Sequence, residues 1–136
     1  MEYLTRDELK EKYNDRDLVR LSNEDDNEEE ITWTVIDSTI VDASEKINEY
    51  LESRYDIENI IVPNTLKRAC LFLVIYYLKY RKGIADDNDL NQYKEAIQYL
   101  EQLRDGKVKL SRNYMKDLNI YSQNEKRFTL KSNIGV

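Results

Sequence analysis

LKRACLFLVIYYL, residues Leu66 to Leu78, is a run of helix length whose apolar character decides the fold. From Ala69 to Leu78 every residue is hydrophobic or aromatic, so a helix here has no polar face to offer to water. The run is too short to cross a bilayer, because a transmembrane helix needs roughly 20 apolar residues. We therefore expect other helices to surround this one, so that it lies either at the centre of a small bundle or partly under a neighbouring subunit.

The composition favours one soluble, intracellular domain. A chain of 136 residues, 35% of them charged, fits a single domain with a modest core. Histidine is absent, which removes the commonest general base and metal ligand. The single cysteine, Cys70, lies in the apolar run, where a buried structural thiol is expected. The charged amino terminus has no apolar segment typical of a secretory signal.

Helices account best for the local sequence patterns. Glycine and proline are scarce, three and one in number, which disfavours a β-sandwich or barrel. Thr5 and Glu8 have the spacing of a capping box, so we expect a short helix that runs to about Tyr13. A second short helix is expected over residues 15–21, after an N-cap at position 14 or 15, Asn14 or Asp15.

An acidic run follows these two helices. Residues 24–30 are all acidic except Asn27, and charges of one sign packed so closely favour an exposed loop. The run does not fit an EF-hand, because Glu28 stands where the loop needs glycine and Thr34 where it needs a bidentate carboxylate. We expect a solvated loop here and no metal site.

The long helices are predicted by apolar residues at spacings of three and four. The first is expected to begin at the N-cap Thr34, and its buried stripe comprises Ile36, Ile40, Ala43, Ile47, Tyr50 and Leu51. An irregular or extended connection over residues 54–62 then leads through Pro63 into the apolar helix, which stops at Gly83.

The last helix is expected to begin at Asp87 or Asp89 and to end at Arg104, before Gly106. Its stripe comprises Leu90, Tyr93, Ile97, Leu100 and either Leu103 or Arg104. Together the patterns predict an all-α fold, a small bundle of about four to five helices around a central apolar helix at about 64–82. Residues 1–110 are expected to form this domain, and 111–136 an extended tail that becomes ordered only on assembly.

Charge differs between the two parts of the chain. Residues 1–106 hold 14 basic and 25 acidic side chains, whereas residues 107–136 hold seven basic and two acidic ones. The basic tail also carries Tyr114, Tyr121 and Phe128, a combination that nucleic-acid-binding segments use. Because the domain is acidic and has no evident recognition fold, docking of the tail onto protein is the favoured interpretation.

Catalytic patterns are absent from the sequence. There is no glycine-rich phosphate loop, nucleophile elbow or cysteine cluster, and no histidine from which to build a triad. We therefore expect no enzyme activity, cofactor or metal. The tyrosines of the predicted helices have two open interpretations, as core residues or as anchors of a subunit interface: Tyr50, Tyr76, Tyr77, Tyr80, Tyr93 and Tyr99.

An ordered set of motifs resembles a known family. A pattern A-S-x-x-I-x-x-Y-L-x-x-R-Y is matched by Ala43, Ser44, Ile47, Tyr50, Leu51, Arg54 and Tyr55. Pro63 and the apolar helix follow, and a pattern G-K-V-x-L is matched by Gly106, Lys107, Val108 and Leu110. Over about residues 3–111 this layout resembles the head-tail connector proteins of Mu-like phages, which are similar to the head-completion adaptors of long-tailed phages. The chain departs from the family in its glutamate-rich acidic loop and its longer tail.

The resemblance implies a structural protein of the virion neck, present in the host cytoplasm before assembly. Such a protein forms a ring beneath the portal, of twelve copies in the family, and joins the capsid to a neck or tail protein. DNA passes through the acidic lumen without sequence-specific binding, and no membrane is involved. The residues we expect at subunit or partner interfaces are Phe72, Tyr76, Tyr80, Lys107, Lys109, Arg112, Tyr114, Lys116, Tyr121, Lys126, Arg127 and Phe128. The alternative is a small phage-encoded regulatory protein that binds DNA or a host protein.

Overall fold

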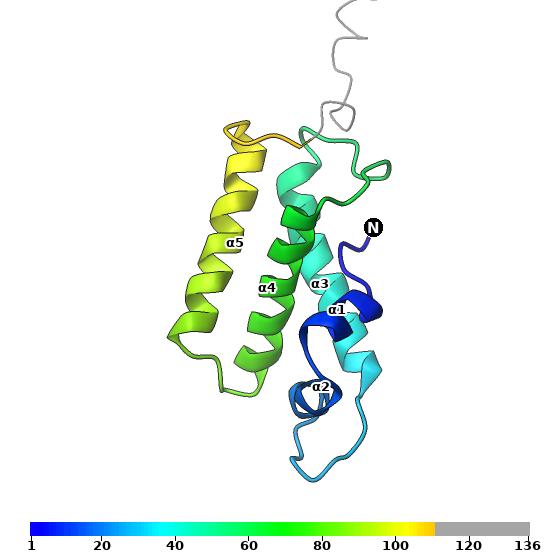
Figure 1. Cartoon of the computed structure of the whole chain (residues 1–136). Helices are drawn as coiled ribbons and strands as arrows, with labels where there is room; N and C mark the ends of the chain where they lie inside the picture. Colours follow the sequence, from blue (N-terminus) through cyan, green and yellow to red (C-terminus); the bar gives the residue numbers. More distant parts are fainter. Residues whose placement is uncertain (111–136) are drawn as a thin grey trace, which may run out of the picture.

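The computed structural model describes residues 1–110, which form five α-helices and no β-sheet (Figure 1). The long helices α3 (Trp33–Leu51), α4 (Asn64–Arg81) and α5 (Asp87–Asp105) pack against one another as a three-helix bundle. The short helices α1 (Arg6–Lys12) and α2 (Asp15–Ser22) lie beside α3 and α4. The prediction of a small all-α bundle is confirmed.

The helix starts follow the predicted capping residues in α1 and α2, and α5 begins at one of its two predicted starts. The Thr5 hydroxyl accepts the amide of Glu8, whose carboxylate accepts the Thr5 amide, so the capping box of α1 is confirmed. Asn14, rather than Asp15, caps α2. α5 begins at Asp87, after the N-cap Asp86.

The predicted start of α3 at Thr34 is wrong. The helix begins at Trp33, and Thr32 occupies the cap position without a side-chain cap bond. The Thr32 hydroxyl donates instead to the Asn23 side-chain oxygen, and the Thr32 amide donates to the Ser22 hydroxyl at 2.9 Å. These bonds to the end of α2 hold the chain before α3 in place of a local cap, and sequence spacing does not reveal them.

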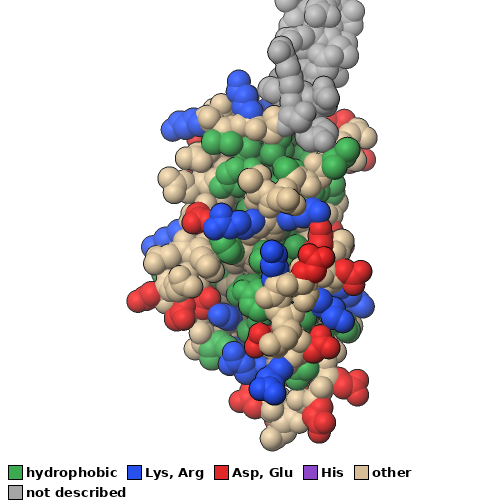
Figure 2. Space-filling model, viewed as in Figure 1, with side chains coloured by type: hydrophobic (Ala, Val, Ile, Leu, Met, Phe, Trp, Pro, Cys, Tyr) green, Lys and Arg blue, Asp and Glu red, His purple; other side chains and the backbone are tan. Residues whose placement is uncertain are grey.

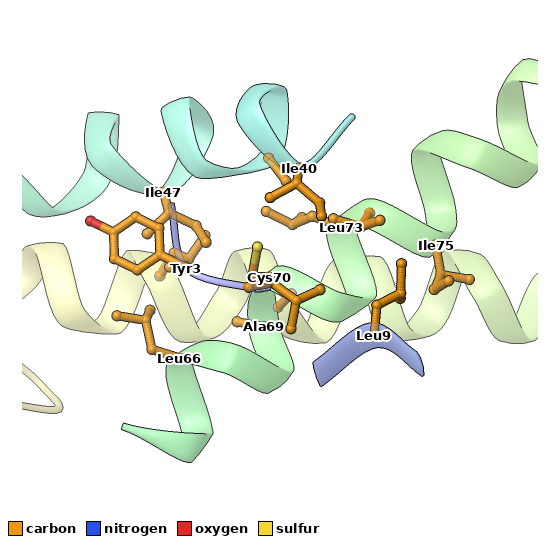
Figure 3. Packing of buried hydrophobic residues seen from close by; sticks show 14 of the residues in the cluster. Tyr3, Leu9, Ile40, Ile47, Leu66, Ala69, Cys70, Leu73 and Ile75 are labelled. Carbon is orange, nitrogen blue, oxygen red and sulfur yellow. The ribbon is translucent and has the colours of Figure 1, made fainter. Parts of the chain in front are cut away.

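Helix α4 is the centre of the core. Seven of its residues are buried. Figure 3 shows part of this core, with Ile40 and Ile47 of α3 on one side of α4 and Leu9 of α1 on another. The predicted α3 stripe is buried as expected, apart from Tyr50 at its edge. Cys70 is buried as predicted, and burial raises the pKa of its thiol to about 12, so the reactive thiolate is scarce at neutral pH.

The amino-terminal segment covers a side of α4 that the sequence patterns leave open. Tyr3 is 1% exposed, its amide donates to the Ser44 hydroxyl at 3.1 Å, and its phenol donates to Asn48. Leu4 and Leu9 are also buried in the core. The bundle therefore hides more of the apolar helix within one chain than the stripes of α3 and α5 alone account for.

The α5 stripe is centred differently from the prediction. Ala96, Leu100 and Leu103 are buried, whereas Leu90, Tyr93 and Ile97 are half-buried and Arg104 is exposed. Ala96 lies with Ala69 of α4 in the wall of one groove between the two helices. The helix ends where predicted, at Gly106, whose φ of 79° is in the left-handed region that favours glycine.

The acidic run is an exposed loop, as predicted, between α2 and α3 at one end of the molecule (Figure 1). The Asn23 amide closes the base of this loop by donating to the carbonyls of Val19 and Glu30 at 2.9 and 2.7 Å. Among residues 1–110, no helix has the length and apolar character that a membrane span requires.

A nearly buried carboxylate joins α4 to the start of α5. Asp89 is 6% exposed, accepts the Asp86 amide at 3.0 Å and pairs with the Lys79 ammonium at 3.0 Å. Burial alone would raise the pKa of the Asp89 carboxyl, but the bonds from Asp86 and Lys79 outweigh burial and lower it below its ordinary value. The charged form of Asp89 therefore stabilises the fold.

Acid is expected to remove this contribution. A carboxyl whose folded-state pKa is lowered stabilises the protein above its unfolded-state value, and the contribution disappears as pH falls through the folded-state pKa. At pH 7, Asp89→Asn should lower the free energy of unfolding by about 2 kcal/mol, because Lys79 loses its partner. The difference in the free energy of unfolding between this variant and wild type should become smaller below about pH 4. Urea titrations across pH test this, with exposed Asp87→Asn as a control that costs less than about 0.5 kcal/mol. A gap that is independent of pH would contradict the assignment.

Candidate interaction surfaces

The outer face of α4 carries a line of side chains four residues apart. Arg68, Phe72, Tyr76 and Tyr80 succeed one another on this face, turn by turn. The Arg68 guanidinium lies 4.8 Å from the Phe72 ring centre and pairs with Glu95 of α5 at 3.2 Å. Figure 2, which views the molecule with α4 in front, shows hydrophobic side chains at the surface among basic ones.

The three predicted interface aromatics differ in their burial. Phe72 and Tyr76 are half-buried, whereas Tyr80 is 69% exposed. The structure brings Tyr76 and Tyr80 together, with ring centres 5.8 Å apart, and stacks Tyr76 on Tyr93 of α5 at 4.5 Å. Tyr93 also lies 6.1 Å from Tyr77. A cluster of four tyrosines therefore joins α4 to α5, and it becomes open to solvent toward Tyr80.

Two open grooves flank Phe72, and both have Arg68 and Phe72 in their walls. The groove between α4 and α5 has a volume of about 330 Å³, and its walls include Ala69, Ala96 and Tyr99. The Tyr99 hydroxyl lies 2.8 Å from that of Thr65 at its rim. The groove between α1 and α4 has a volume of about 550 Å³. Its other walls include Leu4, Leu71 and the ion pair of Glu8 with Lys67.

The outer face of α3 has the opposite character. Asp42, Glu45 and Glu49 are exposed along it, and with Lys46 of the same helix and Tyr77 and Arg81 of α4 they line a shallow groove of about 380 Å³. Burial, Tyr93 and the nearby carboxylates all raise the pKa of the Tyr77 phenol, so it stays uncharged at neutral pH. This face is acidic, whereas the α4 face combines aromatic and basic side chains.

The predicted basic interface residues lie partly outside the described part of the chain. Lys107 and Lys109 are exposed on the segment that follows α5. The other predicted residues lie beyond residue 110 and outside the described residues: Arg112, Tyr114, Lys116, Tyr121, Lys126, Arg127 and Phe128.

Contacts that bind this segment to the bundle were missed by sequence reasoning. Tyr55, which is fully buried, accepts the Leu110 amide with its hydroxyl at 3.1 Å. Arg54 donates from Nε to the Arg104 carbonyl at 3.3 Å and lies against Gly106. The signal was present in the resemblance, because Arg54-Tyr55 and Gly106 to Leu110 are the ends of its two motifs. Their contact depends on folding across about 50 residues of sequence.

The described surface presents shallow grooves and docking faces. Within residues 1–110, no three carboxylate or cysteine side chains converge in a way that would hold a metal ion. The described surface therefore offers an aromatic and basic face on α4, a carboxylate-rich face on α3 and two exposed lysines after α5.

Comparisons with known proteins place the chain among phage proteins. Residues 3–128 match the family described as Bacteriophage Mu, Gp36. Gene product J of Escherichia phage Mu is 32% identical over 74 residues, which are 54% of this chain and 51% of that protein. The Mu-like prophage FluMu protein gp36 of Haemophilus influenzae is 32% identical over 75 residues, 55% of this chain and 52% of that protein. The chain thus spans about half the length of each of these relatives.

Proposed function

Because the chain belongs to the bacteriophage Mu Gp36 family, we propose that it is a structural head-tail connector of a Mu-like phage particle. In this role, copies of the chain form a ring beneath the portal, twelve in number if the ring follows the adaptors it resembles, and join the capsid to a neck or tail protein. The protein is then located in the virion neck, and in the host cytoplasm before assembly.

The observation that carries this proposal is the partly covered outer face of α4. Apolar residues of α4 pack against α3, α5 and the amino-terminal segment, yet Phe72 and Tyr76 are only half-buried and Tyr80 is 69% exposed. Aromatic side chains and arginine are enriched at the centres of protein interfaces. A neighbouring copy that covers this face would bury the tyrosine cluster.

The distribution of charge supports a ring around DNA. Exposed carboxylates on the outer face of α3, at Asp42, Glu45 and Glu49, would repel a phosphate backbone. A lumen lined by such a face lets DNA pass without binding. The same acidic face disfavours the alternative of a DNA-binding regulator.

The proposal is tested by mixing the purified protein with the portal protein of the same phage and imaging the product by electron microscopy. We expect a ring of this chain on the portal. The connector role is lost if no complex forms at any salt concentration and particles assemble normally when the gene is deleted.

The exposed tyrosine at the end of α4 gives a sharper test. Tyr80→Asp should change the free energy of unfolding by less than about 1 kcal/mol, because the side chain is 69% exposed. It should weaken ring formation at least about tenfold, because the interface would bury an unpaired charge. Analytical ultracentrifugation with the portal measures this effect.

Val41→Asp is the matched control, since Val41 is 37% exposed and lies on α3. It introduces the same charge on another face. If both variants assemble as wild type does, or if they lose assembly equally, the outer face of α4 is not the specific subunit contact.

A further inference from the structure

Two distant segments of the chain meet at one end of the bundle. One is the turn after α3, with Arg54 and Tyr55, and the other is the segment after α5, from Gly106 to Leu110. Figure 1 shows both segments at the end of the molecule opposite the acidic loop. Leu110 is the last residue that the structure describes, so the chain continues into residues 111–136 from this end of the bundle.

Tyr55 holds the chain beyond the end of α5. Its side chain is fully buried, and its hydroxyl accepts the amide of Leu110, whose own side chain is 8% exposed. The end of α5 is already capped by backbone groups, since the amides of Lys107 and Val108 both donate to the Gln102 carbonyl. The bond that the Leu110 amide donates to the Tyr55 hydroxyl is thus not a helix cap. It fixes the position of Leu110.

Arg54 fixes the preceding turn. A Cβ added to Gly106 would lie 3.0 to 3.2 Å from the Arg54 guanidinium, so the two residues are packed as closely as glycine allows. The guanidinium also lies near the C-terminal end of α5, where its positive charge complements the helix dipole. Arg54 therefore determines the course of the turn that brings Leu110 to Tyr55.

The charge of residues 111–136, which follow Leu110, suits them to docking on an acidic surface. Residues 111–136 carry five basic and two acidic side chains, whereas residues 1–106 carry an excess of 11 acidic ones. At the end of the bundle itself the charges are balanced, because exposed Lys107 and Lys109 lie on the same two segments as exposed carboxylates at Glu52, Asp56, Glu58 and Asp105. The basic excess therefore belongs to the residues that follow Leu110.

We propose that Arg54 and Tyr55 are positioning residues for assembly, which fix the point and direction from which residues 111–136 reach an acidic surface of a partner protein. This inference rests on the proposed connector function, because it assumes that the tail docks during assembly. A tail held at Leu110 engages its partner at a higher effective concentration than one on a loose connection. The end of the bundle at Leu110 is then the end that faces this partner.

A local measurement tests whether Tyr55 holds the chain. Tyr55→Phe keeps the buried ring but removes the acceptor of the Leu110 amide. Hydrogen exchange of that amide should become about fivefold to tenfold faster in the isolated protein. Tyr3→Phe is the matched control, because Tyr3 is also buried and also uses its hydroxyl in one bond, to the Asn48 side chain rather than to Leu110. It should leave exchange at Leu110 unchanged. Equal exchange at Leu110 in wild type and Tyr55→Phe would overturn the proposal.

A linker variant tests whether the position matters for assembly. Eight Gly and Ser residues inserted between Leu110 and Ser111 leave the contacts of Arg54 and Tyr55 intact. They separate Ser111 from Leu110 by a flexible linker with a root-mean-square length of about 16 Å. Portal binding should weaken about fivefold or more, because the tail's effective concentration falls. The same eight residues added after Val136 should leave binding unchanged.

The outcomes separate this inference from the connector function. If wild type binds the portal and the internal and terminal linkers bind equally well, the positioning role is overturned while the connector function stands. If wild type itself fails to bind at any salt concentration, both are overturned.

Discussion

Replacing Leu73 by alanine is expected to lower the free energy of unfolding by about 3 kcal/mol and the melting temperature by about 10 to 20 °C. Leu73 is fully buried near the middle of α4, where this helix packs against α3 and the amino-terminal segment (Figure 3). Removal of its branched end leaves a cavity that close-packed neighbours fill only in part. A loss of this size is a large share of the total stability of a small domain. Urea unfolding followed by circular dichroism measures it.

Leu71→Ala is the matched control, since it removes the same atoms two residues earlier on α4. Leu71 is only half-buried, at the groove between α1 and α4, so its replacement should cost about 1 kcal/mol. Equal losses for the two variants would contradict a central position for one face of α4. In the assembled ring, Leu71→Ala would cost as much stability as Leu73→Ala only if a neighbouring copy covers Leu71.

The fold was predictable because its signals are local. Capping residues such as Thr5 and Asn14 act on amides three residues away, and an apolar stripe is read within one helix. The start of α3 was missed because Thr32 bonds across the loop to Asn23. The α5 stripe was displaced because Asp89, which is buried, is charged and so does not count as apolar in a periodic pattern, and because Ala96 was passed over for the larger neighbour Ile97.

The interaction surfaces were predictable only in part, because they depend on contacts between distant segments. The spacing on α4 indicated Phe72, Tyr76 and Tyr80, but the stacking of Tyr76 on Tyr93 joins two helices. Covering of α4 by Tyr3 depends on its bond to Ser44, 41 residues away. Sequence spacing carries no information about either contact, because both follow from how the helices pack.

Truncation after Leu110 is expected to abolish assembly on the portal while changing the melting temperature by only a few degrees. The last described residue, Leu110, keeps its bond to Tyr55 in the truncated chain, and so do the contacts of Arg54 with the end of α5. The bundle therefore loses none of its described contacts. The removed residues 111–136 carry a net charge of about +3, which the proposed function uses for docking on a partner. Thermal unfolding and portal binding, measured on the same preparation, separate the two effects.

A full-length variant distinguishes the charge of the tail from its length. Replacing Arg112, Lys116, Lys126, Arg127 and Lys131 by glutamine keeps all 136 residues and removes the five basic charges beyond Leu110. If electrostatic attraction drives docking, this variant should bind the portal nearly as poorly as the truncated chain, and wild-type binding should weaken as salt rises. Undiminished binding by the truncated chain would exclude the tail from docking. A large fall in melting temperature on truncation would instead show that residues beyond 110 contribute to the core, since only lost packing destabilises a bundle whose other contacts remain.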